Sequence, residues 1–229
     1  MMEAVVLAGG LGTRLREVVP DLPKPMAPIA GRPFLEILLT SLSRKGIIRV
    51  VLSVGFMAEK ISGYFGDRFG NLELIYVVER EPLGTGGAVR LGMQVCVTDH
   101  VFVFNGDTFL DLEMDQVEHH WQLHRRPIIV GREHSDTARY GRLVTAEGAV
   151  IGIAEKGGTG PGLINAGCYI FNRGQLDGCP AGTAFSLETN YLPTAITNTR
   201  FDLIVTKGKF IDIGIPEDYE RAQREFVSY

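Results

Sequence analysis

The sequence has few cysteines, and their spacing does not suggest a paired site. Cys96, Cys168 and Cys179 form no Cys-x-x-Cys motif, and their number is odd. This usage is typical of reduced thiols in a cytoplasm and does not suggest a disulfide framework. We therefore expect the cysteines to pack in the interior and to take no part in chemistry.

The chain also lacks long apolar runs. No run approaches the roughly 20 residues that a membrane span needs. The short stretch from Met1 to Ala8 carries Glu3 where a signal peptide would have positive charge. These absences predict a cytoplasmic protein with no membrane partner.

An excess of positive charge is missing as well. The chain has 23 Lys and Arg against 27 Asp and Glu, a net charge of -4. Without a basic field, nucleic acid is excluded as a partner, and any phosphate must be met by local groups. The hydrophobic share of 45% and the charged share of 22% are ordinary for a globular protein, which excludes disorder.

Glycine is abundant, with 28 in 229 residues. The first half of the chain alternates strand-like and helical segments. Apolar strand-like runs are followed by helical patterns, and the strands are apolar on consecutive residues, as in parallel sheets covered on both faces. This predicts an α/β fold with a doubly wound, Rossmann-like, mixed but mainly parallel sheet and helices on both faces. The expected strands are 4–8, 49–54, 72–78 and 101–104, and the expected helices are 34–45, 58–65 and 86–96.

The pattern changes after about residue 127. Extended runs at 128–130, 142–145, 150–154, 164–171 and 201–213 are separated by glycine turns, which predicts a smaller β-rich portion. Pro216 opens a last helix that ends near Phe226. Because no linker interrupts the chain, we expect one domain over 1–229, with parts at about 1–126 and 127–229.

A glycine loop follows the first strand directly, at 7–15. It lacks the Gly-Lys-Ser/Thr ending of a P-loop, and Leu15 stands where a dinucleotide-binding fingerprint has Gly or Ala. Its bare backbone amides can still surround phosphate oxygens, with Arg14 beside them. Lys24 follows between Pro23 and Pro25; alone it would suggest a surface turn, but beside this loop it suggests a second fixed cation.

Two aspartates come at the ends of extended runs. Asp107 follows the strand at 101–104, and Asp212 follows Ile211. Either could be an ordinary turn or cap residue. Strand ends of an α/β sheet meet at one edge, however, and two carboxylates that converge there on a triphosphate suit Mg²⁺. We therefore expect Asp107 and Asp212 to be magnesium ligands.

The ordered motifs of the chain resemble those of the sugar-1-phosphate nucleotidylyltransferases, over nearly its whole length. Within that family the chain is most similar to the short, single-domain D-glycero-D-manno-heptose 1-phosphate guanylyltransferases. The motifs that carry the resemblance are Gly9-Gly10-x-Gly12-Thr13-Arg14-Leu15, Pro23-Lys24-Pro25, Leu83-Gly84-Thr85-Gly86-Gly87, Asn105-Gly106-Asp107, Tyr140-Gly141, Glu155-Lys156, Asn165-Ala166-Gly167 and Asp212-Ile213-Gly214.

The resemblance implies that a sugar 1-phosphate attacks the α-phosphorus of a nucleoside triphosphate and releases pyrophosphate. It assigns Arg14 and Lys24 to the triphosphate and Lys156 to the sugar phosphate. Because a phosphate monoester is mostly dianionic at pH 7, the reaction needs no histidine as a general base. The remaining implied contacts are Leu7, Ala8, Gly9, Gly10, Gly12, Thr13, Glu79, Gly84 and Thr85 for the nucleotide, and Tyr140, Gly141, Glu155, Asn165 and Gly167 for the sugar, with 186–188 as a further candidate.

Glu79 bears on the choice of base. Its position matches one that resembles glutamine in relatives that read uracil. A carboxylate only accepts hydrogen bonds, and guanine offers two adjacent donors, N1–H and the exocyclic amine. We therefore expect GTP, although Glu79 could also end its strand facing water or pair with Arg80.

Other functions fit parts of the sequence. A uridylyl- or cytidylyltransferase acting on a hexose 1-phosphate would keep the same reaction. A nucleotide-sugar sensor would keep the fold without turnover, yet Arg14, Lys24, Asp107 and Asp212 are all present. A glycosyltransferase would favour Asp-x-Asp where Asn105-Gly106-Asp107 stands. The sequence leaves open whether the chain forms a homo-oligomer.

Overall fold

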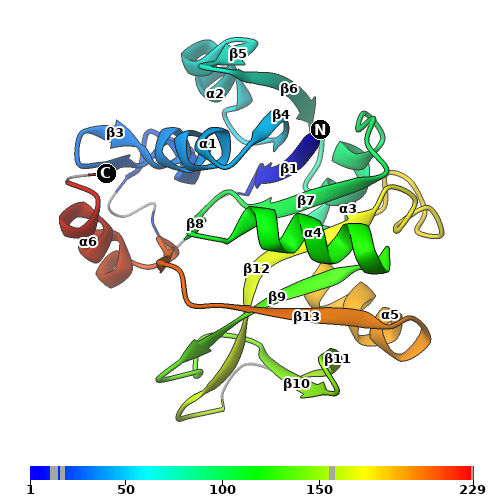
Figure 1. Cartoon of the computed structure of the whole chain (residues 1–229). Helices are drawn as coiled ribbons and strands as arrows, with labels where there is room; N and C mark the ends of the chain where they lie inside the picture. The colour runs from blue at the N-terminus through cyan, green and yellow to red at the C-terminus, as the bar shows by residue number, and fades with distance from the viewer. Residues whose placement is uncertain (11–14, 16–18, 155–157, 228) are drawn as a thin grey trace.

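The computed structural model describes residues 1–10, 15, 19–154, 158–227 and 229. Four parallel strands form the first half of its main sheet: β1 (Met2–Ala8), β4 (Ile47–Val54), β6 (Leu72–Val78) and β7 (His100–Asn105). They lie in the order β7-β1-β4-β6, with Val5 level with both Val103 and Val51 (Figure 1). The four expected strands are therefore confirmed within one or two residues.

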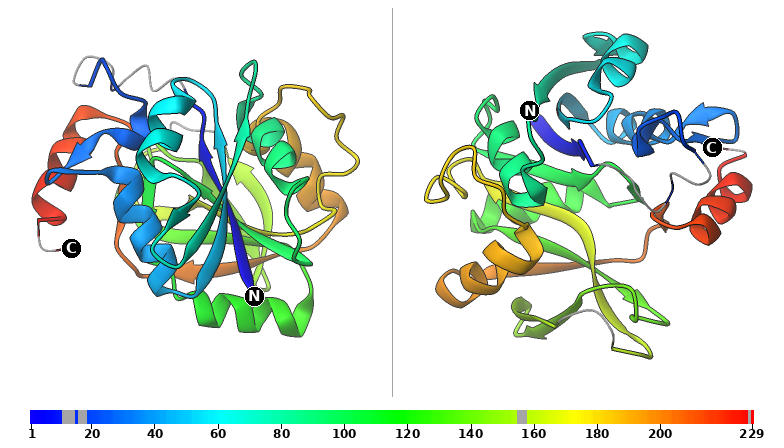
Figure 2. Two further views of the ribbon diagram at one scale, coloured as in Figure 1. Left: turned by 90° about the horizontal axis from the view of Figure 1, so that it is seen from above. Right: turned by 180° about the vertical axis from the view of Figure 1, so that it is seen from behind.

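Helices cover both faces of these strands, because successive residues of each strand point to opposite sides. Ala4 and Val6 of β1 pack in one core cluster with Leu38 of α1 (Phe34–Arg44). Val5 packs in a second cluster with Val89 of α3 (Gly84–Met93). Helices α1 and α3 thus lie on opposite faces of these strands (Figures 1 and 2). The third expected helix is α2 (Ala58–Phe65).

The second half of the sheet is mainly antiparallel. Strand β12 (Gly162–Asn172) runs antiparallel to both β7 and β9 (Ile128–His134), and β13 (Phe201–Thr206) runs parallel to β9. Strand β10 (Arg142–Ala146) pairs with β11 (Ala149–Ala154) and also with β12, which closes a small barrel.

The expectation of a mainly parallel sheet is therefore wrong, although the mixed α/β fold holds. Strands β9 to β12 follow one another with no helix among the described residues between them, and they pair antiparallel: β10 with β11 and with β12, and β12 with β9. The turn between β10 and β11 has positive φ at Glu147 (49°) and Gly148 (70°), a hairpin geometry that forces neighbouring strands to be antiparallel.

The extended run expected at 201–213 is divided in two after Thr206. The second piece, β14 (Phe210–Asp212), leaves the main sheet and pairs with β8 (Thr108–Leu110). Ile211 and Ile213 pack in a third cluster with Phe34 of α1 and Tyr219 of the last helix, α6 (Pro216–Glu225). This packing holds the end of β14 against the first half of the molecule.

No helix among the described residues is long and apolar enough to cross a membrane. Cys96 and Cys168 are buried free thiols, and Cys179 is a partly buried one.

The remaining helices and strands complete the fold. They are η1 (Lys24–Met26), β2 (Pro28–Ile29), β3 (Arg32–Pro33), β5 (Arg68–Phe69), α4 (Met114–His124), the π-helical η2 (Leu187–Tyr191) and α5 (Leu192–Asn198).

Candidate active site

The carboxyl ends of β1 and β7 are joined by a close backbone contact. The Gly106 N–H donates to the Leu7 carbonyl oxygen at 2.9 Å. A Cβ on Gly106 would lie 2.4 Å from that oxygen, so only glycine allows the approach. The next residue, Asp107, is thereby fixed beside the start of the glycine loop.

Glu79 lies against the same loop. Its N–H donates to the Val54 carbonyl oxygen at 2.8 Å, which continues the pairing of β4 and β6. Its carboxylate accepts from the Ser53 hydroxyl at 3.2 Å and from the Leu83 N–H at 3.0 Å. A Cβ on Gly9 would lie 2.3 Å from Glu79 Oε1. The carboxylate is therefore held in a set orientation next to Gly9 and does not simply face water.

Lys24 is held against Asp107. Its Nζ lies 2.5 Å from Asp107 Oδ2, and its side chain is 10% exposed. The 3-10 turn η1 begins at Lys24 with prolines on both sides, so the backbone there has little freedom. The Pro-Lys-Pro segment is thus no free surface turn, because its cation is directed at a carboxylate.

Asp212 faces Asp107 across the β8–β14 pair. The Ile213 N–H donates to the Asp107 carbonyl oxygen at 3.0 Å, and the Gly214 N–H donates to Asp212 Oδ1 at 2.7 Å. Burial and the negative charge of Asp107 raise the pKa of Asp212, while Lys24 and the Gly214 N–H oppose this rise. The two carboxylates are therefore close enough to repel each other, with a single ammonium beside them in the described structure.

This arrangement fits a hard divalent cation that is only partly held by protein. Within the described ranges, no group of three or more His, Cys, Asp or Glu is arranged to hold a metal ion. Mg²⁺ commonly takes one or two carboxylates and completes its shell with phosphate oxygens and waters. Two facing carboxylates, one of them destabilised by the other, are a donor set of that kind.

The β-rich portion reaches this edge through a bulge in β12. The pairing of β12 with β9 shifts between Asn165 and Tyr169, and Gly167 in the bulge has φ of +69°. A Cβ on Gly167 would lie 2.5 Å from Asn105 Nδ2. The Gly167 N–H donates to Asn165 Oδ1 at 3.1 Å. Gly167 and Asn165 are therefore brought beside the end of β7.

Tyr140 and Gly141 lie on the other side of the bulge. The Asn165 N–H donates to the Gly141 carbonyl oxygen at 3.0 Å. The Tyr140 ring packs edge-on against Phe210, with centroids 5.7 Å apart. Burial and the charge of Asp212 raise the pKa of Tyr140, so its hydroxyl stays protonated near neutral pH. The residues expected for the sugar thus lie near those expected for the metal.

Gly84 and Thr85 meet a segment that is distant in sequence. Gly84 has φ of +66°, and a Cβ there would lie 2.6 Å from the Phe185 carbonyl oxygen. The Gly86 N–H donates to the same oxygen at 2.9 Å, and the Phe185 N–H donates to the Leu83 carbonyl oxygen at 2.9 Å. The glycines of this motif therefore leave room for Phe185 to pack against them. The sequence did not indicate this packing role.

Comparison with known proteins gives this site a family. The family model described as nucleotidyl transferase matches residues 3–228. The chain belongs to the nucleotidyl transferase family. It is 38% identical over 229 residues to a D-glycero-alpha-D-manno-heptose 1-phosphate guanylyltransferase of Aneurinibacillus thermoaerophilus, covering 100% of both chains. It is 37% identical over 220 residues to the enzyme of that name from Campylobacter jejuni, covering 95% of this chain and 97% of the other.

A solved structure agrees with this assignment. The chain superposes on HddC from Yersinia pseudotuberculosis complexed with GMP-PN with a TM-score of 0.88 and 39% identity. The match covers 99% of this chain and 100% of that one. Membership of the nucleotidyl transferase family makes the protein an enzyme of nucleotidyl transfer.

Some expected site residues of this nucleotidyltransferase fall outside the described residues: Gly12, Thr13, Arg14, Glu155 and Lys156. At Gly10, an added Cβ would meet nothing within 4 Å, so the described start of the loop is open. The structure brings together Leu7, Ala8, Gly9, Lys24, Glu79, Asp107, Asn165, Gly167 and Asp212 around one edge of the sheet, with Tyr140 and Gly141 adjoining.

Sequence reasoning missed several supporting residues. Ser53 donates to Glu79, and only its place at the end of a strand next to β6 could have suggested it. Arg139 pairs with Asp218 of α6 at 2.7 Å and lies over the Tyr140 ring, 5.5 Å from its centroid. The pair of Arg139 with Asp218 has no local signal, because the two residues lie far apart in the chain.

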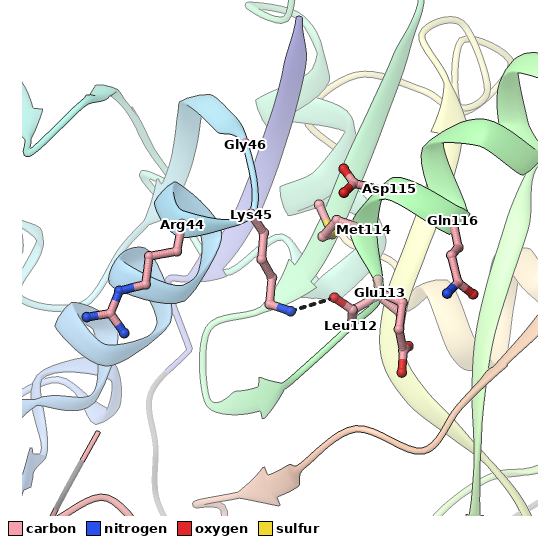
Figure 3. A pocket seen from close by; sticks show the side chains of 8 residues that line it. All are labelled: Arg44, Lys45, Gly46, Leu112, Glu113, Met114, Asp115 and Gln116. Carbon is pink, nitrogen blue, oxygen red and sulfur yellow. Dashed lines mark hydrogen bonds between the residues drawn. The ribbon is translucent and has the colours of Figure 1, made fainter.

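A separate groove of about 450 Å³ lies between the end of α1 and the start of α4 (Figure 3). Lys45 crosses it and donates to the Leu112 carbonyl oxygen at 2.8 Å, while its Nζ lies 2.6 Å from Asp111. Of the expected site residues that the structure describes, none lines this groove.

Proposed function

We propose that the chain joins GTP to D-glycero-α-D-manno-heptose 1-phosphate, giving a GDP-heptose and pyrophosphate. The observation that carries the proposal is the match over all 229 residues, at 38% identity, to an enzyme of that name. The convergence of Lys24, Asp107 and Asp212 at the carboxyl ends of the strands supports it, because phosphoryl-type transfer depends mainly on charge neutralisation and alignment.

The reaction needs little covalent help from the protein. An oxygen of the sugar phosphate attacks the α-phosphorus, the bond from the α-phosphorus to the bridging oxygen breaks, and pyrophosphate leaves with that electron pair. The attacking phosphate is largely dianionic at pH 7 and needs no general base. Lys24 and Arg14 would neutralise the triphosphate, and Lys156 would bind the phosphate of the sugar.

Asp107 and Asp212 would hold Mg²⁺. When bound, the ion would supply charge neutralisation for the phosphate oxygens as the transition state forms. The protein contributes the position of the two carboxylates, which the β8–β14 pair and the contact of Gly106 with Leu7 hold in place. Lys24 then remains close enough to reach a phosphate oxygen beside Asp107.

The sugar would lie against the β12 bulge. Asn165, the backbone of Gly167 and Glu155 would bind hydroxyls, beside Tyr140 and Gly141. Gly167 lies so close to Asn105 that a side chain there would displace that residue. In this proposal the single domain binds its nucleotide mainly through 1–126 and its sugar mainly through 127–229.

Guanine would be read by Glu79. Its carboxylate lies beside Gly9 and already accepts from Ser53 and Leu83, so its orientation is set before a nucleotide enters. The remaining lone pairs can accept the two adjacent donors of guanine. Neither uracil nor cytosine offers such a pair.

A substrate screen tests the proposal. Each of GTP, ATP, UTP and CTP is mixed with Mg²⁺ and a set of heptose and hexose 1-phosphates, and pyrophosphate release is measured. The expected result is the largest kcat/KM for GTP with the heptose phosphate. Preference for UTP or CTP would contradict the assignment of the base, and preference for a hexose phosphate would contradict that of the sugar. The absence of turnover with every pair tested would favour a sensor.

Glu79→Gln tests the base assignment directly. Glutamine can still accept from the Leu83 N–H and donate to Ser53, so we expect the fold to persist. Loss of the charge-assisted pair should lower kcat/KM for GTP about 10- to 100-fold, with little change for UTP. Glu73→Gln, on the strand β6 that leads to Glu79 and half exposed, is the matched control. An unchanged preference for GTP in Glu79→Gln would defeat the assignment.

A further inference from the structure

Glu188 lies at the centre of a hydrogen-bond network that joins three parts of the chain. Its Oε2 accepts from the Thr85 hydroxyl at 2.7 Å and from the Ser186 hydroxyl at 2.9 Å. Its Oε1 accepts from the Tyr169 hydroxyl at 3.2 Å. Among the described residues, no ion pair includes this half-buried carboxylate, so its partners are hydroxyls of α3, β12 and the chain before η2.

On one side the network leads to the β12 bulge. Asn165 Nδ2 donates to the Tyr169 hydroxyl oxygen at 2.9 Å, and Asn165 Oδ1 accepts from the Gly167 N–H. Complete burial, with the charge of Glu188, raises the pKa of Tyr169 well above its usual value. The Tyr169 hydroxyl therefore stays protonated and donates to Glu188, while it accepts from Asn165.

On the other side the network leads to the turn at the start of α3. The Thr85 hydroxyl donates to Glu188 and accepts from the Leu187 N–H at 2.9 Å, so its proton is committed within the protein. The residue before this turn, Leu83, donates to Glu79. Glu188 therefore lies between the turn tied to Glu79 and the bulge that carries Gly167.

We propose that Glu188 is a positioning residue for nucleotidyl transfer, which sets the placement of the β12 bulge relative to the turn at Gly84–Thr85. The proposal rests on the proposed function, in which the nucleotide is bound mainly through 1–126, the part that contains this turn, and the sugar lies against the bulge. A carboxylate that accepts hydrogen bonds from several hydroxyl groups is held by charge-assisted, directional bonds. A shift of about 1 Å between reacting groups can cost about 10²-fold in rate.

Kinetics of Glu188→Ala and Glu188→Gln test the proposal. Alanine leaves three hydroxyls without an acceptor, so we expect kcat/KM for the sugar phosphate to fall about 30-fold or more. Glutamine keeps one acceptor oxygen and should lose less. The Kd for the triphosphate alone, measured by calorimetry, should change less than about 2-fold. Asp177→Asn, a carboxylate paired with Arg90 of α3, is the control and should keep wild-type rates.

A double-mutant cycle separates positioning from simple loss of stability. Thr85→Val and Tyr169→Phe each remove one hydroxyl on either side of Glu188. If Glu188 couples the two sides, the double variant should have a kcat close to that of the more impaired single variant. Thr85→Ser, which keeps the hydroxyl, should retain most of the wild-type rate. Independent, multiplying effects, or wild-type kinetics in Glu188→Ala, would overturn the proposal.

The assays use whichever triphosphate and sugar 1-phosphate the wild-type enzyme turns over. A wrong base or sugar in the proposed function would therefore leave this test in place. If no pair is turned over, the same cycle is measured as thermal unfolding, where additive changes in Tm would show that Glu188 does not couple the two sides.

Discussion

Asp202 and Asp212 lie on consecutive strands, β13 and β14, and have opposite surroundings. Asp202 is almost fully buried, and its carboxylate contacts His120 at 3.0 Å, Arg200 at 2.8 Å and Arg126 at 3.4 Å. Asp212 faces another carboxylate, Asp107. Asp202 is thus placed beside two arginines, whereas Asp212, a short distance further along the chain, is placed against a second negative charge.

The difference is the one expected between a carboxylate that stabilises the fold and one that binds a cation or substrate. Burial alone would raise the pKa of Asp202, but the hydrogen bonds from His120 and Arg200 and the charge of Arg126 outweigh it, so the pKa lies below its usual value. At Asp212, burial and Asp107 together raise the pKa despite Lys24. A charge that the fold leaves poorly compensated is a candidate to bind a cation or substrate.

The largest expected effect comes from Asp107→Asn. If the Asp107–Asp212 pair serves chemistry, loss of one charge should lower kcat about 10³-fold, since it weakens metal binding and frees Lys24 from its partner. Pyrophosphate release at saturating Mg²⁺ is the measurement. Asp115→Asn, exposed on the first turn of α4, is the control. Activity within 10-fold of wild type would remove Asp107 from the site.

The next effect is on stability. Asp202→Asn removes the shared partner of two arginines and His120 and should lower the free energy of unfolding by about 2 kcal/mol at pH 7, with kcat unchanged. Because the folded pKa of Asp202 is lowered, its contribution is present above the unfolded value and is lost as pH falls through the folded value. Urea unfolding of both proteins at pH 7 and near pH 3 should show the difference shrinking. Equal stabilities at pH 7 would reject a structural role.

The smallest effect has the opposite sign. Because the folded pKa of Asp212 is raised, folding favours its protonated form, and its charge costs stability as pH rises above the unfolded value. Asp212→Asn should therefore raise Tm by a few degrees at pH 7 in EDTA, and the gain should vanish near pH 3. A lower Tm than wild type at pH 7 would mean that Asp212 is a structural residue like Asp202.

The first half of the fold could be predicted from the sequence for a physical reason. Strands such as β4 and β7 are buried on both faces, so consecutive apolar residues reveal them, and strand ends then locate Asp107 and the glycine loop at one edge. The sheet order in the second half could not be predicted. Its strands are joined by connections that range from a tight turn between β10 and β11 to a long one through η2 and α5 between β12 and β13, and periodicity does not determine which pairs form.

The supporting contacts of the site were hidden for a different reason. Glu188 reaches Thr85 and Tyr169, and Gly167 reaches Asn105, across large separations in sequence. Local patterns identify Gly167 as a special backbone position but do not name its neighbour. Lys24 is the intermediate case, because its two prolines indicated a fixed side chain while only the folded chain shows that Asp107 receives it.

The most direct test of the account is a crystal structure with Mg²⁺ and a non-hydrolysable GTP analogue. We predict the guanine edge within hydrogen-bonding distance of the Glu79 carboxylate and the metal ion bound by Asp107 and Asp212. A nucleotide bound away from the end of β1, or a metal ion that contacts neither aspartate, would contradict the account.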